Sequence, residues 1–116
     1  MPQIKIEVGG QSFTATLQDN PTSCALLERL PMTISMEELN GNEKYFYLPD
    51  GLPTNSQKPG SIQAGDLMLY GSDCLVLFYE SFSSSYSYTR IGSIDDPENL
   101  ATALGRGGID VTFQKN

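Results

Sequence analysis

Residues 62–79, IQAGDLMLYGSDCLVLFY, form the most densely apolar stretch of this 116-residue chain. Two apolar runs, residues 67–70 and 74–79, flank a short Gly-Ser-Asp segment. Short apolar runs bounded by turn residues are typical of buried strands. Because residues 75–78 are apolar without a break, we expect both faces of the second strand to be covered. That pattern favours a central strand in a closed or two-layered sheet.

Alternating segments on either side of this stretch predict further strands. The first two are separated by Gly9 and Gly10, which are typical of a hairpin turn. Residues 44–48, KYFYL, are aromatic, and the period of two places Tyr45 and Tyr47 on one face. The predicted strands are residues 3–8, 12–17, 32–37, 44–48, 67–70, 74–79, 90–94 and 109–113.

Two short helices interrupt the strands. DNPTS, residues 19–23, is a cluster of helix-start residues, and CALLERL, residues 24–30, follows as a helix that Pro31 ends. Asp96 as N-cap and Pro97 at the first helical position predict a second helix. This helix is expected to end at a glycine, residue 105.

Two segments are rich in turn residues. Residues 49–60, PDGLPTNSQKPG, contain three prolines and two glycines, which predicts a long ordered loop. Residues 81–89, SFSSSYSYT, are typical of an exposed loop, although Phe82, Tyr86 and Tyr88 are costly to leave in water. Such a loop either lines a binding surface or is a hairpin connection whose rings fold back on the core.

About eight short strands and two short helices fit a mainly β fold. The arrangement that satisfies them is a closed antiparallel barrel whose open ends are covered by the helices. The length predicts a single domain over residues 1–116, and no internal repeat is visible. The expected core residues are Ile6, Phe13, Leu27, Leu69, Leu75, Leu77, Ile91 and Val111.

The charge of the chain restricts the class of partner. Fourteen acidic residues against seven basic ones give a net charge of −7, and no basic stripe offsets it. Nucleic acid and anionic membranes are therefore not expected as partners. No apolar run approaches the roughly 20 residues of a membrane helix, and no signal-peptide pattern is visible, so we expect a cytoplasmic location.

The chain has two cysteines, Cys24 and Cys74, and no histidine. This composition excludes cysteine–histidine catalysis, Ser-His-Asp triads and nearly all zinc sites. We expect two reduced, mostly buried thiols, and neither a metal ion nor a cofactor.

Four segments together resemble a known architecture over nearly the whole chain. They are ALLERLP (25–31), NGNEKYFYLP (40–49), residues 62–79 and YTRIGSIDDPENLATAL (88–104). The pattern resembles the cyclophilin-like barrel, and more narrowly the small bacterial cyclophilin-like proteins of uncharacterised function. The resemblance implies a closed β-barrel with one helix at each end.

The chain is similar, more remotely, to the cyclophilin peptidyl-prolyl isomerases. Those enzymes use an arginine on one strand and a glutamine on another, and the nearest segments here, residues 45–47 and 74–78, contain neither. Lowering the isomerisation barrier of about 18–20 kcal/mol requires a fixed cationic donor beside an apolar proline pocket. Arg90, at the exit of the serine-rich segment, is either that donor or a surface arginine packed on a tyrosine.

These observations favour a non-catalytic binding module, in which a small ligand or an extended peptide lies in an aromatic-lined groove. A weak peptidyl-prolyl isomerase is the alternative, and a structural or accessory module that binds a protein partner is a second alternative. Aromatic rings with a polar tip suit a site half in water. The candidate ligand-binding residues are Tyr45, Tyr47, Tyr70, Phe82, Tyr86 and Arg90.

Overall fold

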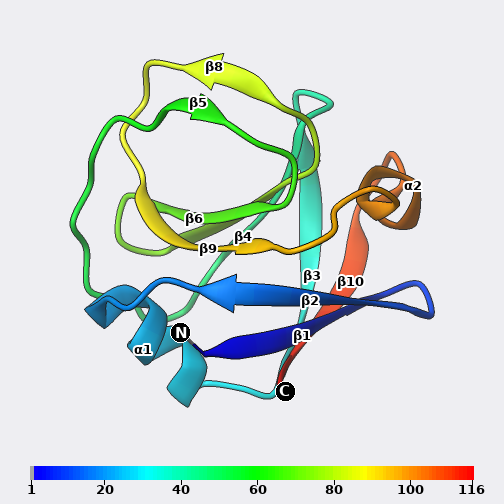
Figure 1. Cartoon of the computed structure of the whole chain (residues 1–116), viewed down its shortest axis with the longest axis horizontal. Helices are drawn as coiled ribbons and strands as arrows, with labels where there is room; N and C mark the ends of the chain where they lie inside the picture. Colours follow the sequence, from blue (N-terminus) through cyan, green and yellow to red (C-terminus); the bar gives the residue numbers. More distant parts are fainter. Residues whose placement is uncertain (1) are drawn as a thin grey trace.

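The computed structural model describes residues 2–116 and shows a closed antiparallel barrel of eight strands, with a two-stranded sheet beside it (Figure 1). The predicted mainly β barrel with two short helices is confirmed. In chain order the elements are β1 (Gln3–Val8), β2 (Gln11–Leu17), α1 (Pro21–Glu28), β3 (Met32–Leu39), β4 (Glu43–Tyr47), β5 (Gly60–Ile62), β6 (Asp66–Tyr70), β7 (Cys74–Phe78), β8 (Phe82–Ser84), β9 (Thr89–Ile94), α2 (Leu100–Leu104) and β10 (Ile109–Lys115).

Neighbours round the barrel follow the order β1-β10-β3-β4-β7-β6-β9-β2, and β2 pairs with β1 to close it. Gly9 and Gly10, with φ angles of 55° and 83°, form the predicted hairpin turn, because glycine adopts positive φ without strain. Between β2 and β9, Gly92 lies opposite Leu17. A Cβ at position 92 would lie 2.5 Å from the carbonyl oxygen of Thr16, so only glycine allows these strands to approach so closely.

The barrel interior is filled by every second side chain of the strands, as a period of two requires. The leucines of β6 and β7 all lie in this interior cluster and are fully buried. Leu26 from α1 and Leu100 and Leu104 from α2 belong to the same cluster. The predicted core residues are buried there, except that Leu27 is only partly buried at its edge.

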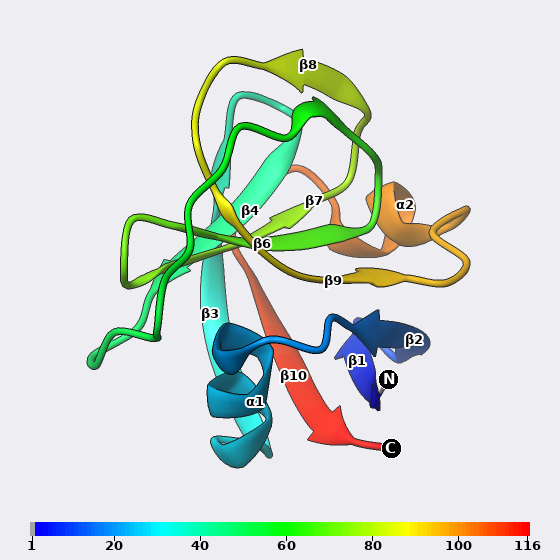
Figure 2. The same ribbon diagram turned by 60° about the vertical axis from the view of Figure 1, so that its left-hand side comes forward.

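A second apolar cluster lies outside the barrel, where β5 and β8 lie over its β6–β7 region (Figures 1 and 2). We call it the outer cluster. Every residue of β7 is buried, with two leucines in the interior and the other three side chains in the outer cluster. The expectation that both faces of this strand are covered is therefore confirmed. The outer cluster consists of Ile62, Met68, Cys74, Val76, Phe78 and Tyr88, with Tyr45 and Phe82 packed against it.

Strand β8 lies in the serine-rich segment that the sequence predicts to be a loop, and β5 begins at Gly60, the last residue of the other predicted loop. Ile62 pairs with Phe82, and Gln57 forms an isolated bridge with Tyr88, so the serine-rich segment is partly a paired strand. The loop prediction is wrong for Phe82–Ser84 because this pairing joins segments distant in sequence. The pairing of β5 with β8 depends on burial of Ile62 against the barrel. No local sequence pattern indicates this burial.

Both helices begin at positions other than those predicted. Helix α1 begins at Pro21, and its N-cap Asn20 accepts a hydrogen bond from the backbone N–H of Ser23 at 2.8 Å. Helix α2 begins at Leu100 because the backbone first forms a turn, in which the N–H of Leu100 donates to the carbonyl of Pro97 at 3.0 Å. Within residues 2–116, no helix is long and apolar enough to cross a membrane.

Lys44 on β4 is fully buried inside the barrel. Its Nζ donates hydrogen bonds to Glu38 Oε1 (2.8 Å) and to the carbonyl oxygens of Gly105 (2.9 Å) and Gly107 (2.7 Å). These acceptors satisfy all three donors of the ammonium group. Burial raises the pKa of Glu38, but hydrogen bonds from Lys44 and Tyr79 help to outweigh it, so the net pKa is lowered. The network ties β3 and β4 to the turn that follows α2.

Replacing Lys44 should destabilise the fold strongly. We expect Lys44→Ala to lower the free energy of unfolding by about 3–5 kcal/mol, because Glu38 and two carbonyls lose their buried donor. Urea unfolding followed by circular dichroism measures the loss. Lys5→Ala is the control, since Lys5 is exposed and its pair with Glu7 at 3.6 Å is worth at most about 1 kcal/mol. Equal losses for the two variants would contradict the role assigned to Lys44.

Candidate functional site

The outer face of β4 supplies one wall of the candidate site. Lys44 and Phe46 point into the barrel interior, so the alternation of the strand turns Glu43, Tyr45 and Tyr47 outward. Because β4 is paired on both sides, with β3 and β7, these outward side chains stand on rigid backbone.

The neighbouring strands β7 and β6 extend the same outer face. The register sets Val76 opposite Tyr45 and Cys74 opposite Tyr47. On its other side, Cys74 lies opposite Tyr70 of β6. Three adjacent strands therefore place tyrosine, cysteine and tyrosine in one row across the outside of the barrel.

These side chains line a groove of about 360 Å³, which we call the tyrosine groove. Its volume lies at the lower end of the range typical of small-molecule sites. Five of the six tyrosines of the chain line it. The lining residues are Leu39, Asn40, Glu43, Tyr45, Tyr47, Tyr70, Cys74, Val76, Tyr86 and Tyr88.

Contacts between rings hold the walls of the groove in place. Tyr45 and Tyr47 meet edge to face, with ring centroids 5.8 Å apart. Tyr70, on the other side of β7, contacts Tyr86 at 6.1 Å and Tyr88 at 5.5 Å. Tyr88 is only 6% exposed, whereas Tyr86 is 62% exposed at the rim. Because such pairs contribute about 0.5–1.5 kcal/mol each, the rings are positioned before any ligand arrives.

Besides Tyr88, two ionisable groups, Cys74 and Glu43, are buried in the groove. Burial raises the pKa of the Cys74 thiol to about 11, with the charges of Asp73 and Glu43 adding to the effect. The thiol is therefore protonated at neutral pH and is not an activated nucleophile. Burial, followed by the charge of Glu38, also raises the pKa of the Glu43 carboxyl group.

Four of the six predicted site residues come together in the groove, and two do not. Phe82 instead packs against Phe78 in the outer cluster, with ring centroids 5.6 Å apart, because β8 pairs with β5 there. Arg90 lines a separate polar cavity. The four that line the groove are Tyr45, Tyr47, Tyr70 and Tyr86.

The sequence interpretation missed Glu43 and Tyr88. Glu43 lies two residues before Tyr45 on β4, so the period of two was sufficient to place it on the same face. Tyr88 lies outside the named strands, and its position depends on the isolated bridge to Gln57. No local signal distinguished Tyr88 from Tyr86, although the first is buried and the second is exposed.

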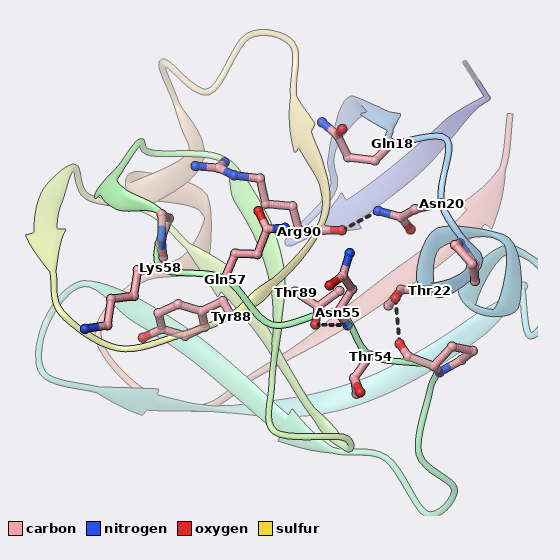
Figure 3. A pocket seen from close by; sticks show the side chains of 13 residues that line it. Gln18, Asn20, Thr22, Thr54, Asn55, Gln57, Lys58, Tyr88, Thr89 and Arg90 are labelled. Carbon is pink, nitrogen blue, oxygen red and sulfur yellow. Dashed lines mark hydrogen bonds between the residues drawn. The ribbon is translucent and has the colours of Figure 1, made fainter.

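A second cavity of about 360 Å³ lies between the start of α1, residues 53–59 and β9 (Figure 3). Three of its polar side chains, those of Asn20, Thr22 and Thr89, form hydrogen bonds within the protein. Thr22 Oγ1 donates to the carbonyl of Pro53 at 2.6 Å, and Asn20 Nδ2 donates to the carbonyl of Arg90 at 2.9 Å. These bonds hold the long loop and α1 against the barrel. We therefore regard this polar cavity as a junction at which the long loop and α1 are attached to the barrel. The tyrosine groove is the better candidate site.

Comparison with known proteins agrees with this architecture. The sequence profile described as "Cyclophilin-like family" matches residues 6–114. The chain belongs to the cyclophilin-like family. The solution structure of a hypothetical protein from Archaeoglobus fulgidus is similar over 99% of this chain and 95% of that chain, with a TM-score of 0.65 and 17% identity. That likeness supports the cyclophilin-like fold alone. No curated protein matches the sequence significantly.

In this cyclophilin-like barrel, Arg90 is set apart from the tyrosine groove. Its Nη1 lies 3.8 Å from Asp66 Oδ2, and its side chain is 48% exposed. Tyr88 lines both hollows, so the two cavities share this ring. No arginine or lysine is among the described residues that line the groove, and the cation that an isomerase needs is therefore not placed there.

The two cysteines of the cyclophilin-like chain have different surroundings. Cys74 is buried, as expected, but Cys24 is exposed, so that part of the prediction is wrong. Two residues along α1 from Cys24, Leu26 is fully buried, and a helix turns such neighbours to opposite sides. In the part of the chain described, residues 2–116, no group of three or more cysteine or acidic side chains could hold a metal ion.

Substitution of tyrosines should separate the rim of the groove from the outer cluster. Tyr86→Ser is expected to lower the free energy of unfolding by less than about 1 kcal/mol, because the ring is mostly exposed. Tyr88→Ser should cost about 3 kcal/mol, because the ring is buried against Tyr70 and Phe78. Thermal and urea unfolding test both. A steep loss for Tyr86→Ser would mean that this ring belongs to the core.

Proposed function

We propose that this protein is a non-catalytic binding module that holds a small ligand or an extended peptide in the tyrosine groove. The observation that carries the proposal is the gathering of five of six tyrosines in one hollow outside the barrel. The interior core is complete without them, since it is built from aliphatic side chains and phenylalanines. The rings are therefore not needed to close the barrel.

The exposure of these rings supports a binding role. Tyr47, Tyr70 and Tyr86 are 62%, 47% and 62% exposed, although they are among the largest side chains of the molecule. Contiguous exposed aromatic surface is typical of ligand and protein interaction sites. Tyrosine offers apolar area together with a hydroxyl, and it loses little conformational freedom on binding.

The chemistry of the groove favours binding over catalysis. The Cys74 thiol is protonated at neutral pH, since its pKa is raised to about 11. A weak peptidyl-prolyl isomerase remains the alternative function, with Arg90 as the cationic donor, because this arginine lines the polar cavity together with Tyr88, whose ring also lines the groove. A module that binds a protein partner through the same rings is the second alternative.

The binding proposal is tested by titration of ¹⁵N-labelled protein. The probes are blocked pentapeptides with a central Xaa-Pro bond and a panel of water-soluble aromatic and aliphatic fragments. We expect saturable chemical-shift changes at the amides of Tyr45, Val76 and Tyr86. Tyr86→Ser should weaken binding about tenfold, which corresponds to about 1.4 kcal/mol.

Tyr79→Phe is the matched control for this titration, because Tyr79 is the tyrosine outside the groove. Its hydroxyl donates to Glu38 Oε1 at 2.7 Å, so the variant should change stability but not affinity. Shifts confined to the polar cavity, or no shifts with any probe, would contradict the proposal.

The isomerase alternative predicts a different result. We expect the purified protein not to accelerate cis–trans isomerisation of a standard Xaa-Pro peptide above the uncatalysed rate, because no cation lies in the groove lining. A protease-coupled assay measures the rate. Robust turnover that Arg90→Ala abolishes, while a distant Arg106→Ala variant retains it, would replace the binding proposal with the isomerase.

A further inference from the structure

Glu43 lies in the tyrosine groove with only 8% of its surface exposed. Within residues 2–116, its carboxylate takes part in none of the ion pairs and none of the side-chain hydrogen bonds. Acidic side chains are almost never buried without a partner, because an uncompensated charge in apolar surroundings is costly. The raised pKa of Glu43, caused first by burial and then by Glu38, reflects that cost.

Lys44, the neighbour of Glu43 in the sequence, and Arg90 are engaged elsewhere, and Lys58 lines the polar cavity and not the groove. Lys44 points to the opposite face of β4, and its three donors are taken by Glu38 and two glycine carbonyls. Arg90 faces Asp66 and lines the polar cavity. Among residues 2–116, no described ion pair therefore supplies a countercharge for Glu43.

The rings around Glu43 suit a positive charge. The face of a tyrosine ring carries negative potential and attracts an ammonium group within about 6 Å of its centroid. Tyr45 and Tyr47 line the β4 side of the groove, and Tyr70 and Tyr88 line the side of β6. The net charge of −7 draws cations toward the molecule from further away. The carboxylate, the rings and the net charge of the protein thus all favour a positively charged ligand.

An organic cation fits this lining better than a metal ion. A metal ion requires several oxygen, nitrogen or sulfur ligands, and Glu43 is the only carboxylate among the described residues that line the groove. The Cys74 thiol is protonated and therefore a poor ligand. Apolar groups such as Val76 and Leu39 offer contacts to alkyl carbons. This combination of carboxylate, rings and apolar surface matches an ammonium group that carries alkyl carbons.

We propose that the tyrosine groove binds an organic cation, an alkylammonium or quaternary ammonium group, whose charge faces the Glu43 carboxylate while its alkyl groups contact the tyrosine rings. This inference rests on the proposed binding function and names its ligand class. The group is carried either by a free small amine or by a lysine side chain of an extended peptide. The chemistry of recognition is the same in both cases.

A pair of isosteric probes isolates the contribution of charge. Choline and 3,3-dimethylbutan-1-ol have the same shape, but a neutral carbon replaces the charged nitrogen in the second. In titrations of ¹⁵N-labelled protein at pH 7, we expect choline to shift the amides of Tyr45, Val76 and Tyr86 saturably. The carbon analogue should bind at least tenfold more weakly, because it gains nothing from the carboxylate or the ring faces.

Glu43→Gln tests the role of the carboxylate. The variant should bind choline at least fivefold more weakly and should melt at a higher temperature than the natural protein at pH 7. The rise is expected because a raised pKa means that ionised Glu43 costs stability in the folded state. A glutamate that merely supported the fold would change melting in the opposite direction.

Glu7→Gln is the matched control for this variant. It removes the same charge from β1, which lies across the closed barrel from β7. Both the affinity for choline and the melting temperature should be retained in Glu7→Gln. Unchanged choline affinity in Glu43→Gln, or equal losses in the two variants, would overturn the role of Glu43.

Blocked pentapeptides with a central lysine, trimethyllysine or norleucine distinguish the two sources of the cation. A lysine or trimethyllysine peptide that binds at least tenfold more tightly than choline indicates a peptide ligand, whereas similar affinities indicate a free amine. Equal affinity for choline and its carbon analogue would overturn the cation inference and leave the binding groove in place. Absence of binding by choline and the lysine peptides, together with the proline peptides and fragments, would overturn both proposals.

Discussion

Strand β7 has to be covered on both faces, because all five of its residues, Cys74–Phe78, are apolar and buried. Closing the sheet into a barrel covers only the inward side chains, Leu75 and Leu77. The outward side chains need a second layer, which β5, β8 and Tyr88 provide. The tyrosine groove lies on this same outer face. The burial of one strand therefore explains both the barrel and the position of the candidate site.

Two adjacent charged residues of β4, Glu43 and Lys44, lie on opposite faces of the sheet and have different surroundings. Lys44 points inward and is fully satisfied by Glu38 and two carbonyls, so it stabilises the closed end of the barrel. Glu43 points outward into the groove and, among residues 2–116, has no ion-pair partner. The charge of Lys44 thus stabilises the fold, whereas the carboxyl group of Glu43 faces the ligand that we propose for the groove. Because successive side chains of a strand point to opposite faces, neighbouring residues can serve these two different roles.

Much of the fold could be predicted because strand signals are local. The alternation in β1, β2 and β10, the Gly9-Gly10 turn and the apolar run of β7 each depend on neighbouring residues. The site could be predicted only in part. Tyr45 and Tyr47 share a face by periodicity, but Phe82 was misplaced because its partner strand, β5, has only three residues and no pattern of its own.

The sequence by itself determined a closed β-barrel, because apolar alternation and turn residues leave few other ways to bury these strands. Only the tertiary structure decided which aromatic rings meet, because Tyr86 and Tyr88 have the same local sequence signal. Tyr88 is buried against Tyr70 and Phe78, while Tyr86 stays at the rim. That difference arises from the bridge between Gln57 and Tyr88, a contact between distant segments whose energy comes from packing on the barrel.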